Sequence, residues 1–297
     1  MDALRQILSS DFLLRNALYI SVLVGFICPL VGVFLVLRRL VFMGVALPQV
    51  SSMGVAVALS LPMWLGPTVM PHSSQAEHVF AFVGSLVFSL VAILAWAFLE
   101  RHGRGHPEGR LGTAYVVATA VSILLLSKNR YAEIGWLDLL KGEVIAISTF
   151  DLVLAFTSFA LVLLVLWAFH KEFLLVSFDR TMAITLHKNV LVWDLLLYAL
   201  IGLTVSVSVL SVGPLISFGF LLIPALTAHL LARDMKRFAV LASLIGGAVA
   251  LIGFYLAYLW DFPVGPMEVA LLGVVYVTTW LMRRIGIRSR RNASGGG

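Results

Sequence analysis

Long apolar segments separated by short polar loops run through most of the chain and limit what it can fold into. They span about 16–37, 43–61, 79–99, 111–127, 150–169, 193–212, 214–232, 238–259 and 266–282. Most of them reach the roughly 20 residues that an α-helix needs to cross a bilayer. Charged residues make up only 12% of the 297 residues, whereas soluble domains carry about 25%. The sequence therefore predicts an all-α integral membrane protein, a polytopic bundle of 8–9 transmembrane helices.

The apolar segments follow one another without an appended soluble domain, so we expect a single transmembrane domain over 16–287. Residues 1–15 place apolar side chains on one side of a short helix, which is typical of a segment lying in the membrane interface. The tail 288–297 is basic and then rich in Gly and Ser, and we expect it to be disordered.

Most of the 21 Lys and Arg residues fall in one of the two alternating sets of loops that nine spans would produce. This set includes Arg38, Arg39, Lys171, Arg180 and the arginines after Met282. Basic loops stay in the cytoplasm, so the sequence predicts a multi-pass protein of the inner, or cytoplasmic, membrane with its C-terminus in the cytoplasm.

Several function classes are excluded by what the sequence lacks. The single cysteine, Cys28, rules out an internal disulfide and a thiolate metal cluster. The chain has no G-x-x-x-x-G-K-[ST] phosphate loop, no H-E-x-x-H helix and no G-x-S-x-G elbow. The net charge of +6 reflects loops between spans and does not indicate nucleic-acid binding. We therefore expect a transport subunit rather than an enzyme, with no cofactor bound by this chain.

Two stretches combine small or polar residues with signals for helix breaks, as expected beside a translocation path. In 44–58, Gln49, Ser51 and Ser52 stand among small residues, which fit either a path or close helix packing. In 203–237, Ser208 precedes Gly213-Pro214, and Pro224 follows in the same stretch. These prolines predict a broken helix near 213–224, and broken helices in membranes commonly line cavities.

Two ionisable residues near span ends are candidates for cation binding. His229 lies just before the inner surface, where it could instead be an ordinary hydrogen-bonded interfacial residue. Glu268 lies at the outer end of the last span, where it could bind a cation or simply be solvated.

The segment 173–192 is too polar to cross a membrane and too patterned for a flexible linker. Phe178, Met182 and Leu186 recur every four residues with Ala183 beside them, which indicates one face of a short helix. Asp179 can cap its first turn. Such a helix could be offered to a partner in the cytoplasm, or it could lie on the lipid headgroups.

Three blocks in order resemble the permease subunits of ABC-type importers for zinc and manganese, the ABC-3 family. They are GVFLVLRRLVFMGVALPQVSSMGVA (32–56), SFDRTMAITL (177–186) and SVGPLISFGFLLIPALTAHLL (211–231). The likeness covers roughly 16–282. It implies that Phe178, Asp179, Met182, Ala183 and Leu186 form a coupling helix for a cytoplasmic ATPase, through which ATP acts. It also implies a homodimer and an extracytoplasmic substrate-binding protein.

The chain departs from the family pattern where that pattern has Asp and His in G-D-A-L-S-H, because Val45 and Gln49 stand there. Valine cannot coordinate a metal, and a glutamine amide is a weak neutral ligand. The remaining metal candidates are Gln49, His229 and Glu268. A non-metal cargo, or a stand-alone secondary transporter or channel, stays open as an alternative. The last of these would need buried ionisable relays, but no Asp, Glu, Lys or Arg lies in 41–75 or 196–231.

Overall fold

A computed structural model describes residues 14–65, 74–101, 107–128 and 148–294. Every regular element in these ranges is a helix, so the predicted all-α class is confirmed. The helices are α2 (Arg15–Leu37), α3 (Val41–Leu65), α4 (Ser74–Arg101), α5 (Pro107–Lys128), α7 (Thr149–Ala168), α8 (His170–Phe178), α9 (Arg180–Thr185), α10 (Val190–Leu231), α11 (Met235–Trp260) and α12 (Val264–Ser294).

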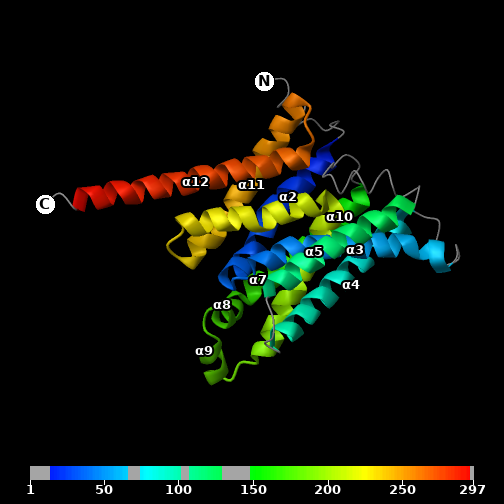
Figure 1. Ribbon diagram of the computed structural model, residues 1–297, viewed down its shortest axis with the longest axis horizontal. Helices are drawn as coiled ribbons and strands as arrows, with labels where there is room; N and C mark the ends of the chain where they lie inside the picture. Colours follow the sequence, from blue (N-terminus) through cyan, green and yellow to red (C-terminus); the bar gives the residue numbers. More distant parts are fainter. Residues whose placement is uncertain (1–13, 66–73, 102–106, 129–147, 295–297) are drawn as a thin grey trace.

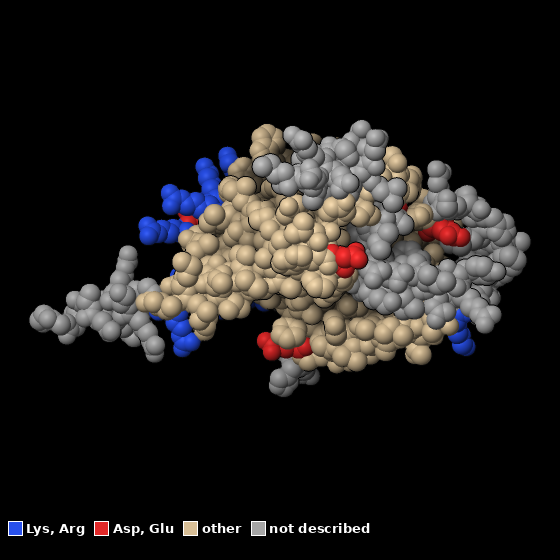
Figure 2. Space-filling view, turned by 90° about the horizontal axis from the view of Figure 1, so that it is seen from above, with Lys and Arg blue, Asp and Glu red and all other residues tan. Residues whose placement is uncertain are grey.

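Eight of these helices are long and apolar enough to cross a membrane. They pack side by side as an elongated bundle (Figure 1), with α2 and α10 in its core and α12 reaching out at one end. Seen from above, the described residues are almost all uncharged, and basic side chains gather toward one end (Figure 2). This surface suits a lipid environment, as the composition predicted.

The longest helix, α10, is bent in its middle. Its 42 residues would extend about 63 Å if straight, roughly twice the hydrocarbon thickness of a bilayer. Gly213 interrupts it with φ 84° and ψ 167°, a conformation open to glycine and strained for other residues. The Ser217 hydroxyl donates to Ser208, although nine residues of straight helix would separate them by about 13 Å. The two arms, 190–212 and 214–231, therefore bend sharply toward each other (Figure 1).

This bend confirms the break predicted at Gly213-Pro214. The two separate apolar segments in the sequence, 193–212 and 214–232, are the two arms of one bent helix. Pro224, in contrast, lies inside the second arm without interrupting it, because Gly213 is the one non-helical position within α10. The break therefore comes from the glycine and the proline that follows it, and not from the second proline.

Close helix packing depends on small residues at the crossing of α3 and α4. A Cβ atom added to Gly54 would lie 2.4 Å from the carbonyl oxygen of Gly84. The two backbones therefore touch, which is the role that small residues commonly have between membrane helices.

At the chain ends, most of the expected interfacial segment 1–15 lies outside the described residues, and α2 begins at Arg15. At the other end, α12 continues through 288–294, where composition favoured a disordered tail. Neither Pro nor Gly stands in 287–294 to interrupt the helix. Residues 295–297 lie outside the described ranges.

Candidate functional site

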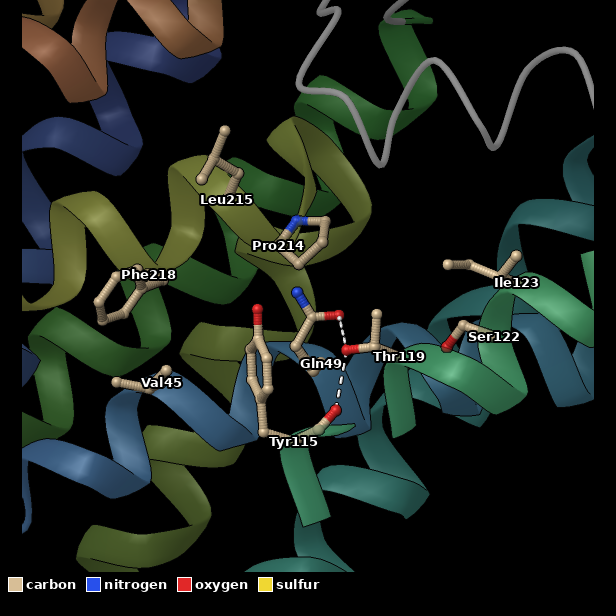
Figure 3. A pocket seen from close by; sticks show the side chains of 9 residues that line it. All are labelled: Val45, Gln49, Tyr115, Thr119, Ser122, Ile123, Pro214, Leu215 and Phe218. Atoms are coloured by element: carbon tan, nitrogen blue, oxygen red, sulfur yellow. Dashed lines mark hydrogen bonds between the residues drawn. The ribbon is translucent and has the colours of Figure 1, made fainter. Parts of the chain in front are cut away.

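A cavity of about 400 Å³ lies where α3 and α5 meet the bend of α10 (Figure 3). It is lined by Val45, Gln49, Tyr115, Thr119, Ser122, Ile123, Pro214, Leu215 and Phe218. Val45 and Gln49 stand four residues apart on α3, so both side chains point to the same face of that helix. Pro214 and Leu215 directly follow Gly213, so the bend of α10 supplies one wall of the cavity.

Among the described residues, the polar groups that line this cavity are all neutral. They are the Gln49 amide and the hydroxyl groups of Tyr115, Thr119 and Ser122. The Thr119 hydroxyl lies 3.3 Å from Gln49 Oε1 and 2.8 Å from the Tyr115 carbonyl oxygen (Figure 3). Because one hydroxyl proton serves one strong bond at a time, the shorter contact holds it and the Gln49 amide is only weakly engaged. The cavity can therefore hydrogen-bond a neutral or hydrated guest, but the described residues that line it offer no carboxylate, imidazole or thiolate.

Of the five residues expected on a translocation path, only Gln49 lines the cavity. Ser51 is fully buried and forms a 2.5 Å hydrogen bond with Ser85 on α4. Two residues after Gln49 the helix has turned by about 200°, which carries Ser51 to the opposite face.

The other expected path residues also lie in helix contacts. Ser208 is bonded to Ser217 across the bend of α10, and Ser52 and Pro224 are buried. For Ser51 and Ser52, this burial corresponds to the close packing that the sequence left open as the alternative.

The three candidate metal ligands do not come together. Gln49 lies in the cavity, whereas the exposed His229 ring packs against Phe238 with their centroids 5.4 Å apart. Glu268 is fully buried, so it is not the solvated interfacial acid that its position suggested, and Ser21 donates to its Oε1 at 2.5 Å. The described residues contain no group of three or more His, Cys, Asp or Glu that could hold a metal ion.

The polar segment between α7 and α10 forms a corner of two short helices, α8 and α9, instead of one helix. The chain bends at Asp179, where φ is −140° and ψ is 89°. Its carboxylate accepts a 2.8 Å hydrogen bond from the Met182 amide, so the predicted cap is confirmed. Phe178 ends α8 and Leu186 follows α9, which corrects the single helix expected over 178–186.

The corner exposes a cluster of large apolar side chains, which we call the apolar corner. Its members are Phe178 (62% exposed), Met182 (53%), Ile184 (65%) and Leu186 (53%). Ala183 is fully buried beneath them, so it fixes the position of α9 rather than forming its surface. Sequence periodicity found three of the four exposed residues and missed Ile184, which lies outside the every-fourth pattern.

A group of charged side chains around the buried Asp194 ties this corner to the bundle, and we call it the Asp194 cluster. Asp194, in the first turns of α10, accepts a 2.6 Å bond from Arg38 Nη1 at the end of α2. Its second carboxylate oxygen pairs with Arg180 of α9. Arg38 Nε also donates to the Ser177 hydroxyl of α8 at 3.0 Å. The side chains of Asp194 and Arg38 are only 5% and 8% exposed, so this pair is shielded from solvent.

The sequence reading treated Arg38 only as a topology marker and did not single out Asp194. The available signal was an acid placed inside the start of an otherwise apolar segment, where a charge without a partner would be unfavourable. The cluster therefore joins α2, α9 and α10 by ion pairs, and α2 to α8 by a hydrogen bond. The sequence patterns did not predict these contacts.

A family model, curated relatives and solved structures each match nearly the whole chain. The model of the ABC 3 transport family matches residues 10–283. The chain is 27% identical to the manganese transport system membrane protein MntC of Listeria monocytogenes serovar 1/2a, over 90% of both chains. It is 24% identical to a probable iron transport system membrane protein of Haemophilus influenzae, over 95% of this chain and 93% of that one. Among solved structures, PsaBC from Streptococcus pneumoniae in complex with Fab superposes with a TM-score of 0.78, at 25% identity and 94% coverage of both chains.

Proposed function

Because the chain belongs to the ABC 3 transport family, we propose that it is the membrane-spanning permease subunit of an ABC importer that carries a divalent metal ion, of the manganese type. The match over residues 10–283, together with the relatives named for manganese and iron transport, supports this proposal. Two copies of the chain surround a shared path in the cell membrane. A separate cytoplasmic ATPase drives them, and an extracytoplasmic binding protein delivers the cargo.

The apolar corner is the surface on which the ATPase docks. Four large apolar side chains that are at least half exposed are unfavourable in water, and burial against a protein groove would remove that cost. The basic loops favour a cytoplasmic position for this end of the bundle, where an ATPase has access to ATP.

Movement of the docked corner reaches the cavity through the Asp194 cluster. Arg180 carries it to Asp194, and so to the first arm of α10, which ends at Gly213 beside the cavity. Arg38 carries it to the end of α2, and α3 begins three residues later, one turn before Val45. Both α3 and α10 therefore link the driven end to the cavity wall, and their relative motion would open the cavity alternately to each side.

The neutral cavity limits how an ion is held there. Mn²⁺ and Zn²⁺ are bound firmly by carboxylate and imidazole groups, and Val45 and Gln49 provide neither. We infer that an ion passes this point with most of its hydration shell in place. The same neutral lining supports a second candidate, in which the permease carries an uncharged complex of the metal or another uncharged small molecule.

The docking assignment can be tested in proteoliposomes that hold the permease with its ATPase. We expect Asp179→Lys combined with Met182→Glu to abolish ATP-dependent ⁵⁴Mn²⁺ uptake while leaving membrane insertion intact. The first change reverses a charge on the docking surface, and the second adds a charge to an apolar side chain there. Lys171→Glu is the control, since it reverses an exposed charge on α8 away from the apolar corner. Normal uptake by the double variant would refute the docking assignment.

A further inference from the structure

Next to the Asp194 cluster lies a pocket of about 320 Å³ that combines three arginines with an apolar wall. We call it the arginine pocket. Arg38 and Arg39 reach it from the end of α2, and Arg180 reaches it from α9. Leu37 and Val176 are among the apolar residues that line it. The pocket therefore combines cationic and apolar side chains in its lining, where α2 ends and α8 meets α9.

Positive charge in the pocket exceeds what the described residues neutralise. Both oxygens of Asp194 are already engaged, one by Arg38 and one by Arg180. Arg38 Nη2 is buried and has no hydrogen-bond partner among the described residues. A buried cationic N–H group without an acceptor is unfavourable. Three guanidinium groups therefore stand beside one carboxylate, and the excess positive charge would attract a further anion.

Arg39 occupies a backbone position where glycine is the usual residue. The Leu40 amide bonds to the Leu35 carbonyl oxygen at 2.8 Å, the closing hydrogen bond of a helix C-terminal cap. That cap needs a left-handed residue, which is most often glycine, and Arg39 takes it with φ 59°. Left-handed arginine is strained, and strained residues cluster at ligand sites. The arginine side chain thus stands in the pocket wall despite an unfavourable backbone.

We propose that the arginine pocket binds the phosphate group of an anionic phospholipid headgroup. Guanidinium groups form paired hydrogen bonds with phosphate oxygens, and Arg39 and Arg180 approach from two different elements. The apolar residues of its lining suit the first carbons of a lipid tail. Basic pockets between transmembrane helices at the cytoplasmic surface bind such headgroups. The ligand would lie directly beneath the α8–α9 corner and add to the contacts that hold it on the bundle.

Native mass spectrometry of the purified full chain tests this proposal, with phosphatidylglycerol and phosphatidylcholine as the probes. We expect tighter binding of phosphatidylglycerol, and a loss of about tenfold in Arg39→Gln, because a hydrogen bond to a charged group is removed. Arg39 is the residue to change because it is exposed and takes no part in the Asp194 cluster. Arg233→Gln is the matched control, since it removes another exposed basic charge elsewhere on the chain.

Inorganic phosphate identifies the source of the anion. If phosphate competes with phosphatidylglycerol in the wild type but not in Arg39→Gln, the pocket recognises the phosphate group, as proposed. Equal loss of phosphatidylglycerol in Arg39→Gln and Arg233→Gln would overturn the proposal, because the effect would then be one of net charge. It would also be overturned if Arg39→Gln weakened only the binding of the ATPase subunit, because the pocket would then belong to a protein interface.

Discussion

The Asp194→Asn substitution is the sharpest test of how the α8–α9 corner is held. It keeps the size of the side chain and removes the only carboxylate that Arg38 and Arg180 share in the described structure. Breaking a buried ion pair from one side costs about 3–5 kcal/mol. Asparagine retains one acceptor oxygen, so we expect the low end of that range. The Arg180 contribution is small, under about 1 kcal/mol, because its side chain is 63% exposed and screened by solvent.

Two measurements separate this prediction from a general loss of packing. Unfolding by SDS in mixed micelles should show the loss of stability in Asp194→Asn and a much smaller change in Arg180→Gln. Hydrogen exchange should rise over 170–185 in Asp194→Asn, because α9 loses its ion pair with α10 and Arg38, which donates to Ser177 of α8, loses its carboxylate partner. The double variant Arg38→Gln with Asp194→Asn should recover part of the loss, since it removes the unpaired buried charge.

Three results would refute the reasoning about the Asp194 cluster. One is an equal loss of stability in Asp194→Asn and Arg180→Gln, because the burial of Arg38 would then add nothing to the effect of losing its partner. Another is a double variant whose loss is the sum of the two single losses. The third is unchanged exchange in 170–185, because the corner would then be held by its apolar contacts alone.

Three further predictions concern the cavity and the helix crossings. Val45→Asp with Gln49→His should increase the amount of Mn²⁺ retained by the purified protein at least tenfold in elemental analysis, because it places two metal ligands on one face of α3. The control, Val45→Asn with Gln49→Asn, adds no charge and should not increase it. Gly54→Ala should destabilise the protein to thermal unfolding by more than about 1 kcal/mol, because its Cβ would meet a backbone carbonyl of α4 at 2.4 Å, whereas Gly112→Ala has nothing within 4 Å and should be neutral. Gly213→Ala should cost about 1–3 kcal/mol in the same assay, since φ 84° strains any residue with a side chain.

Sequence patterns predicted those parts of this fold that depend on neighbouring residues. Apolar length fixed the spans, Gly213-Pro214 marked the bend, and Asp179 was recognised as a cap because its acceptor and donor lie three residues apart. Each of these features depends on residues within a few turns of helix, so the sequence alone is sufficient to predict it.

The features that the sequence reading missed depend on contacts between distant segments. Arg38 and Asp194 are 156 positions apart, and no local pattern links them. The polar character of a residue also did not predict which way its side chain points. Gln49 faces the cavity, while Ser51 faces α4. Glu268 of α12 stands near the end of a span but is buried, because α2 and α11 pack closely against it. Burial of this kind is set by the tertiary packing and could not be read from position in the span.

The neutral cavity has a consequence for where the cargo is chosen. Amide and hydroxyl groups can replace few of the waters around a divalent cation, so the cavity discriminates weakly between ions of equal charge. Weak binding also lets the cargo leave quickly, which conduction requires. On the proposed function, selectivity then rests on the protein that delivers the cargo. Gln49→Ala should therefore leave the ratio of Mn²⁺ to Zn²⁺ uptake in proteoliposomes within about twofold, while a different delivering protein should change it. A large shift in that ratio from Gln49→Ala alone would show that the cavity itself selects the ion.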